Sequence, residues 1–167
     1  MAYMGLLLAA AVLLGYVEAL IPIDLMIPGV KLGLANCAIL FALYSFGLKE
    51  ALIISLLRTL IIGFVFTSPA MLIYSISGAA VSLLIMAIIK KSGHFSVFAV
   101  SACGGISHNI TQLIIAGFVM LNAGAGLLRI LTFYLPVLVI AGIITGLLNA
   151  FFANILIKRI FIHSDMH

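Results

Sequence analysis

The chain is dominated by long runs of apolar residues that only short turn or charged segments interrupt. Six such runs cover about residues 4–20, 32–47, 49–66, 70–89, 95–121 and 127–157. A helix needs about 20 apolar residues to cross a bilayer, and a backbone in lipid must satisfy its own hydrogen bonds. The pattern therefore predicts an all-α integral membrane protein, in which residues 1–167 form a single transmembrane domain, a six-helix bundle.

The composition supports a membrane protein. Of the 167 residues, 66% are hydrophobic and 7% are charged, whereas about a quarter of the residues in a soluble domain are charged. These proportions exclude a soluble globular domain. The net charge of +4 comes from basic residues that stand singly or in pairs. We interpret this charge as a topology signal rather than as affinity for nucleic acid.

The positions of lysine and arginine orient the predicted bundle. Five basic residues fall on one side of it, namely Lys49, Lys90, Lys91, Lys158 and Arg159. The other side receives Lys31 and Arg129. Since loops rich in basic residues stay in the cytoplasm, the pattern predicts that both termini are cytoplasmic. The apolar connection at residues 21–31 then lies outside, and we expect it to fold back over the helices.

The first two apolar runs each raise a question. Residues 1–20 have no basic leader, so we expect them to form the first span rather than a cleaved signal. Residues 32–47 are short for a full span. This helix must tilt little, thin the bilayer locally, or be partly shielded by protein.

Two ionisable residues lie inside predicted spans, Glu18 and Arg58. Such residues are costly in lipid and usually face the bundle interior, pair with one another or line a solute pathway. Glu18 is either a cavity carboxylate or a side chain that reaches the headgroups. Arg58 lies near mid-membrane and predicts a contact with solute or loop, with a buried structural salt bridge as the alternative.

The sequence SHNITQ, residues 107–112, brings polar groups into the middle of the fifth run. Helical spacing predicts that His108, Asn109 and Gln112 share one broad face. Such a cluster either holds helices together by hydrogen bonds or forms a wall for a ligand. His108 has no second metal ligand at i+3 or i+4, so the sequence predicts no metal site.

The external half of the predicted bundle carries a mildly positive charge. Lys31, Arg58 and Arg129 outnumber the acidic residues there. Because arginine offers a planar fork of donors to carboxylates and phosphates, we expect an anionic solute. Lys31 is then a gate or anion contact, with a plain interfacial anchor as the alternative. The predicted substrate-binding residues are Glu18, Lys31, Asn36, Arg58, Tyr74, His108, Asn109, Gln112 and Arg129.

Small residues recur at four-residue spacing on the first predicted helix. The pairs are Gly5 with Ala9 and Ala11 with Gly15. This spacing lets another helix approach closely. The face either packs inside the bundle or docks a second membrane protein. The glycines at 142 and 146 offer similar contacts, which we expect to be internal.

Several chemistries are absent from the sequence. It has no phosphate-binding glycine loop, no Gly-x-Ser-x-Gly and no His-Glu-x-x-His motif. Aspartate occurs only at Asp24 and Asp165, whereas a prenyl-diphosphate synthase clusters aspartates to hold magnesium. Cys37 and Cys103 stand apart in apolar sequence and are expected to be buried core residues. We therefore expect no enzyme activity and no cofactor, and any ATP-driven transport needs a separate motor.

Four motifs carry a family likeness: YVEALIP at residues 16–22, PGVKLGLAN at 28–36, FGLKEALIISLLR at 46–58 and SHNITQL at 107–113. Together they resemble the family called Gx transporter or heptaprenyl diphosphate synthase component I, over about residues 5–155. That family is in turn similar to the substrate-binding S components of energy-coupling-factor transporters, which are six-helix bundles.

The resemblance implies a solute pocket near the external face and a first helix that meets a transmembrane coupling subunit driven by two cytoplasmic ATPases. We therefore expect an uptake subunit in the cell membrane, the inner or plasma membrane of a prokaryote. Its solute is small, anionic, and vitamin-like or an isoprenoid precursor. The alternatives are a non-catalytic membrane accessory of polyprenyl diphosphate or quinone biosynthesis, and a solitary carrier.

Overall fold

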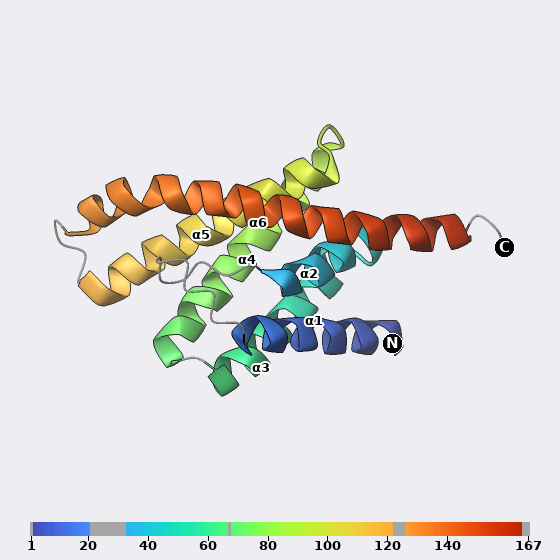
Figure 1. Cartoon of the computed structure of the whole chain (residues 1–167), viewed down its shortest axis with the longest axis horizontal. Helices are drawn as coiled ribbons and strands as arrows, with labels where there is room; N and C mark the ends of the chain where they lie inside the picture. Colours follow the sequence, from blue (N-terminus) through green and yellow to red (C-terminus); the bar gives the residue numbers. More distant parts are fainter. Residues whose placement is uncertain (1, 21–32, 67, 122–125, 165–167) are drawn as a thin grey trace.

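The computed structural model describes residues 2–20, 33–66, 68–121 and 126–164 (Figure 1). Within these ranges the chain forms α-helices and no strand. The helices are α1 (Ala2–Leu20), α2 (Leu34–Ser45), α3 (Leu48–Phe66), α4 (Pro69–Ser92), α5 (Val97–Leu121) and α6 (Gly126–Ser164). The predicted all-helical architecture is confirmed.

Four of the helices are long and apolar enough to cross a membrane. They supply the segments Ala2–Leu20, Met71–Ser92, Val97–Phe118 and Thr132–Arg159. α2 has 12 residues, and at a rise of about 1.5 Å per residue it is shorter than a hydrocarbon core of about 30 Å. α3 has 19 residues but includes Lys49, Glu50 and Arg58. The chain is therefore a multi-pass membrane protein with at least four apolar spans.

Two helices run past their predicted ends. α4 ends at Ser92 rather than at 89, where Gly93 adopts a left-handed φ of 73° and its N–H bonds to the Lys90 carbonyl. α6 continues to Ser164 rather than to 157. The sequence prediction used charged residues as helix ends because they mark the membrane surface. Backbone hydrogen bonding does not stop at that surface, so the helices continue beyond it.

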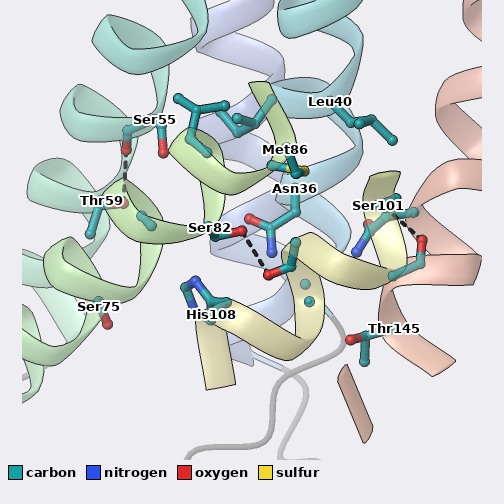
Figure 2. A pocket seen from close by; sticks show the side chains of 18 of the residues that line it. Asn36, Leu40, Ser55, Thr59, Ser75, Ser82, Met86, Ser101, His108 and Thr145 are labelled. Atoms are coloured by element: carbon teal, nitrogen blue, oxygen red, sulfur yellow. Dashed lines mark hydrogen bonds between the residues drawn. The ribbon is translucent and has the colours of Figure 1, made fainter. Parts of the chain in front are cut away.

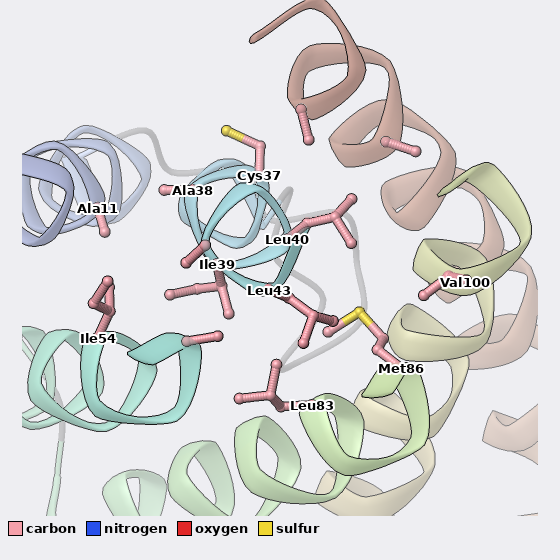
Figure 3. Close-up of a cluster of buried hydrophobic side chains, with 14 residues drawn as sticks. Ala11, Cys37, Ala38, Ile39, Leu40, Leu43, Ile54, Leu83, Met86 and Val100 are labelled. Atoms are coloured by element: carbon pink, nitrogen blue, oxygen red, sulfur yellow. The ribbon is translucent and has the colours of Figure 1, made fainter. Parts of the chain in front are cut away.

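α2 lies at the centre of the bundle, with the other helices around it (Figure 3). It packs against α1, α3 and α6, and its second half meets Leu83 and Met86 of α4 in the main hydrophobic cluster. Eight residues of α2 are buried: Ala35, Cys37, Ala38, Ile39, Leu40, Phe41, Ala42 and Leu43. Of the three explanations for its short length, shielding by protein is the one that this burial supports.

Glycine packing joins α5 to α6, the pair in most extensive contact. A Cβ on Gly142 would stand 2.7 Å from the carbonyl carbon of Gly105, and a Cβ on Gly146 would stand 2.6 Å from the backbone carbonyl oxygen of Ser101. Real side chains do not tolerate such distances from backbone atoms. The internal packing role expected for Gly142 and Gly146 is confirmed, and Gly105 takes part in the same seam.

The side chain of Lys90 contacts the carboxyl end of α2. Lys90 of α4 donates a hydrogen bond of 2.6 Å from Nζ to the Leu43 carbonyl, and its Nζ lies 4.8 Å from the centre of the Tyr44 ring. A cation is favourable at a helix carboxyl end and over an aromatic face. Lys90 therefore stabilises the last turn of the central helix.

The two cysteines have different surroundings. Both are free thiols; Cys37 is buried and Cys103 is partly exposed. Cys103 lies in an outward-facing apolar groove between α4 and α5. The prediction of a buried core residue is thus confirmed for Cys37 and wrong for Cys103, because Cys103 faces away from the bundle interior.

Candidate functional site

A cavity of about 100 Å³ lies inside the bundle, and all six helices contribute to its wall. On the same kind of measure a single water needs roughly 10–15 Å³, so the cavity has room for a small solute. Its wall combines charged, carboxamide and hydroxyl groups with a few aliphatic side chains. Figure 2 shows Asn36 of α2 between residues of α4 and α5, with His108 and Ser82 on those two helices.

One side of the cavity is built where α1, α2 and α3 meet. Arg58 of α3 donates a hydrogen bond of 3.2 Å from Nη1 to Oδ1 of Asn36. Its Nε is buried and makes no hydrogen bond to any residue that the structure describes. Glu18 of α1 is close enough to interact electrostatically with Arg58. The guanidinium thus keeps hydrogen-bonding capacity beyond its contact with Asn36.

Glu18 also ties the first two helices together. Its Oε1 accepts a hydrogen bond from the Gly33 N–H, just before α2 begins at Leu34. Gly33 has a left-handed φ of 69°, and a Cβ there would stand 2.9 Å from Nδ2 of Asn36. Glycine is therefore required at this entry to α2. The contact holds Glu18 at the cavity wall.

The opposite wall comes from α5. His108, Asn109 and Gln112 all line the cavity, as their predicted common face requires. Asn109 also donates from Nδ2 to the Leu138 carbonyl of α6 at 2.9 Å, so it joins two helices as well. Gly78 of α4 makes room for this wall, because a Cβ there would stand 2.9 Å from Cγ of Gln112 and 3.1 Å from the His108 ring.

Sequence reasoning missed the hydroxyl groups of the wall and one carboxamide. Ser82 donates to the Gly104 carbonyl at 2.8 Å, and Ser101 donates to the Gly146 carbonyl at 2.7 Å (Figure 2). Because both hydroxyls donate their proton to a backbone carbonyl, their oxygens can act toward a solute only as hydrogen-bond acceptors. Serine and threonine are common in membrane helices, so nothing in the sequence singled them out. The missed polar residues are Ser55, Thr59, Ser75, Ser82, Ser101, Thr145 and Asn149.

Of the predicted site residues whose side chains the structure describes, Tyr74 is not among those that line the cavity. Tyr74 is buried, but it precedes Ser75, which does line the cavity, and successive residues point roughly 100° apart around a helix. The Tyr74 hydroxyl has no partner among the described residues. Lys31 and the side chain of Arg129 lie outside what the structure describes.

The small residues of α1 fall on two different faces. Ala11 and Gly15 are buried, and a Cβ on Gly15 would contact Ile62 at 3.2 Å. Gly5 and Ala9 are exposed. Since each residue advances roughly 100° around a helix, the two pairs cannot share one face. The docking prediction therefore does not hold for Ala11 and Gly15, which pack inside this chain.

The residues that the structure describes contain no group of three histidine, cysteine, aspartate or glutamate side chains placed to hold a metal ion. Within those ranges the site is a hydrogen-bonding cavity with one arginine and one glutamate in its wall. Such a wall can bind and orient a solute.

Comparison with known proteins gives one match. The sequence matches the family described as heptaprenyl diphosphate synthase component I over residues 7–156, and the chain belongs to that family. No curated protein and no solved structure matches it. The chain is thus a multi-pass membrane protein of this family, whose resemblance to transporter S components comes from the motifs quoted above.

Proposed function

We propose that this chain is the solute-binding membrane subunit of an ATP-driven uptake transporter of the energy-coupling-factor type. The observation that carries the proposal is the polar cavity to which all six helices contribute, with Arg58 in its wall. Polar and ionisable side chains inside a membrane bundle are costly, and they are typical of solute pathways.

The charges of the cavity favour an anionic solute. A charged donor that is buried without a partner costs more than the roughly 1–3 kcal/mol of a neutral one, and Nε of Arg58 is such a donor among the described residues. Glu18 already accepts a hydrogen bond from the backbone of Gly33. A carboxylate or phosphate oxygen from a solute would satisfy the guanidinium.

The remaining roles follow from position along the wall. Asn36, His108 and Gln112 orient the solute by hydrogen bonds. Asn109 already donates a hydrogen bond from Nδ2 to α6 and binds the solute with the rest of its carboxamide. For Lys31 and Arg129, whose side chains lie outside what the structure describes, the sequence pattern alone supports a role as added positive charge near the solute. The solute class remains that of a small anion, vitamin-like or an isoprenoid precursor.

ATP-driven transport requires partners, because the sequence has no nucleotide-binding loop. The exposed face of α1, with Gly5, Leu6, Ala9 and Leu13, is the docking surface for a coupling subunit that carries two cytoplasmic ATPases. The chain itself is not an enzyme. It crosses the inner or plasma membrane of a prokaryote six times, with both termini in the cytoplasm. In support, α1 begins and α6 ends toward the same side of the view in Figure 1.

The family description also favours a second function, that of a membrane accessory for a prenyl synthase. Such an accessory needs a surface for a soluble enzyme. The connections on the proposed cytoplasmic side are short, because only residues 46–47 separate α2 from α3 and only residues 93–96 separate α4 from α5. These connections offer little area for docking.

Co-purification from native membranes, combined with uptake by intact cells, tests the first function against the second. The transporter proposal predicts that two ATPases and a membrane coupling subunit co-purify with the tagged full-length chain. Gly5→Leu together with Ala9→Leu should reduce their recovery, whereas Val137→Leu, at an exposed position on α6, is the control away from α1. Recovery of a prenyl synthase in place of ATPases would contradict the proposal and favour the accessory.

A further inference from the structure

We infer that the solute is a short, non-aromatic carboxylate that carries hydroxyl or amide groups. This inference rests on the proposed function and narrows its solute class, because it excludes those isoprenoid precursors that are diphosphates. It excludes two broad classes that an anion-binding cavity could otherwise accept, namely flat aromatic acids and prenyl diphosphates. Three features of the cavity carry it: the absence of phenylalanine and tyrosine from the described wall, the chemistry of the polar wall, and the charges of Arg58 and Glu18.

The described wall contains no phenylalanine or tyrosine. Sites for flat ring systems gain affinity from stacking on aromatic side chains. The chain has 11 phenylalanines and five tyrosines, so their absence from the wall is a property of the cavity rather than of the composition.

The polar wall is suited to several separate hydrogen bonds. Carboxamides reach it from α2, α5 and α6 at Asn36, Gln112 and Asn149. Each carboxamide offers both donors and acceptors, and the Ser82 and Ser101 oxygens remain acceptors. A solute with hydroxyl or amide groups along a short chain can use these positions. A bare hydrocarbon chain would leave them unpaired.

The apolar part of the wall is continuous with the hydrophobic core. Ile39, Leu40, Leu83 and Met86 line the cavity and also belong to the main hydrophobic cluster, so the core closes the cavity on that side. Figure 2 shows Leu40 and Met86 together, apart from His108 and Thr145. The cavity as a whole has a volume of about 100 Å³, which these apolar side chains share with the polar groups, so little space is left for a long prenyl chain.

Arg58 and Glu18 carry opposite charges, so the described wall is close to neutral overall, and the Nε of Arg58 is the charged donor left for a solute. Among the described wall residues, Arg58 is the permanently charged cation and Glu18 is its acidic neighbour. Arginine binds a single carboxylate through parallel hydrogen bonds. A diphosphate carries more negative charge and would face Glu18 across the same small space. The site therefore favours a monocarboxylate.

Equilibrium dialysis of the purified full-length chain in lipid nanodiscs tests the inference. The probes form a matched set: N-acetylserine and 3-hydroxybutyrate for the inferred class, N-acetylserine amide as the uncharged analogue, benzoate as the aromatic acid, and dimethylallyl diphosphate as the isoprenoid precursor. We expect the first two to bind at least tenfold more tightly than the other three. Tighter binding of benzoate or dimethylallyl diphosphate would overturn the inference, and so would the absence of binding by the first two.

A pair of variants separates a ligand contact from a structural effect. Gln112→Leu should weaken binding of N-acetylserine about tenfold, while the adjacent Thr111→Val should leave it unchanged, since Thr111 lines the outward-facing groove instead. Equal binding by Gln112→Leu and wild type would contradict the role of the carboxamide wall. Because the co-purification test uses no probe, recovery of ATPases with tight benzoate binding would overturn the solute class and leave the transporter proposal standing.

Discussion

The two ends of α2 have opposite surroundings, although both lie inside the bundle. At the amino end, Gly33 and Asn36 make hydrogen bonds to Glu18 and Arg58 beside the cavity. At the other end, residues such as Leu43 are buried among apolar side chains. One short helix thus contributes to a polar site with its first turn and to the stability of the bundle with its last two. The difference predicts that substitutions at the two ends act on different measurements.

The largest effect is expected at the apolar end. Leu43 is 1% exposed and does not line the cavity. Leu43→Ala should lower the free energy of unfolding by about 2–5 kcal/mol, because it removes buried methyl groups and leaves a void. Unfolding in a detergent titration measures the loss. Solute affinity per folded molecule should stay unchanged.

Leu13 provides the matched control, because it is 63% exposed on α1. Leu13→Ala should change the free energy of unfolding by about 0.5 kcal/mol or less, the usual range for surface positions. An equal loss for the two variants would contradict the assignment of the α2 end as the stabilising core.

The second effect is expected at the polar end. Arg58→Gln should weaken binding of an anionic solute tenfold or more, since the charge that attracts the anion is removed and the hydrogen bond to Asn36 can still form. The melting temperature of the variant shows whether the fold is retained. Lys158→Gln removes a positive charge far along α6 and should leave affinity unchanged. If both variants bound the solute as tightly as the wild type does, the proposal that Arg58 binds an anionic solute would be wrong.

A smaller effect on stability is expected at Lys90. Lys90→Met removes the hydrogen bond to Leu43 and the cation over Tyr44, which should cost about 1 kcal/mol of unfolding free energy. The neighbouring Lys91→Met serves as the control, because Lys91 is exposed. Solute affinity should not change. A large loss of affinity in Lys90→Met would show that the two ends of α2 are coupled.

The smallest effect is expected where α4 passes the polar wall. A methyl group at Gly78 would press on Gln112 and His108, whose side chains can move by a few tenths of an ångström. Gly78→Ala should therefore weaken binding only a few-fold. Gly5→Ala is the control, because nothing lies within 4 Å of a Cβ there. Titration calorimetry with a bound solute measures both, and an unchanged affinity in Gly78→Ala would argue against a role for the α5 wall.

The helical architecture could be predicted because it follows from composition and from the cost of unpaired backbone in lipid. The ends of α4 and α6 could not, since charged residues mark the membrane surface and not the end of a helix. Shielding by protein, which the central position of α2 provides, was only one of the three explanations for its short length. Burial around the whole helix leaves no periodic pattern that would distinguish it from a helix exposed to lipid.

Parts of the candidate site were also predictable. Glu18, Arg58 and the polar face of α5 stand out because charge and carboxamides are rare in spans. The serines of α4 and α5 do not stand out, because a hydroxyl that bonds to backbone is inexpensive in any membrane helix. Tyr74 was predicted to bind substrate only because of its expected depth in the membrane. Depth does not determine which side of a helix a residue faces.

Native mass spectrometry of the wild-type chain and Arg58→Gln, each gently solubilised from the same native membranes, tests the central claim most directly. The cavity account predicts that the wild type retains a small anionic solute and that Arg58→Gln loses it while remaining folded. The same solute on both proteins, or an empty wild type attached to a soluble prenyl synthase, would contradict the account.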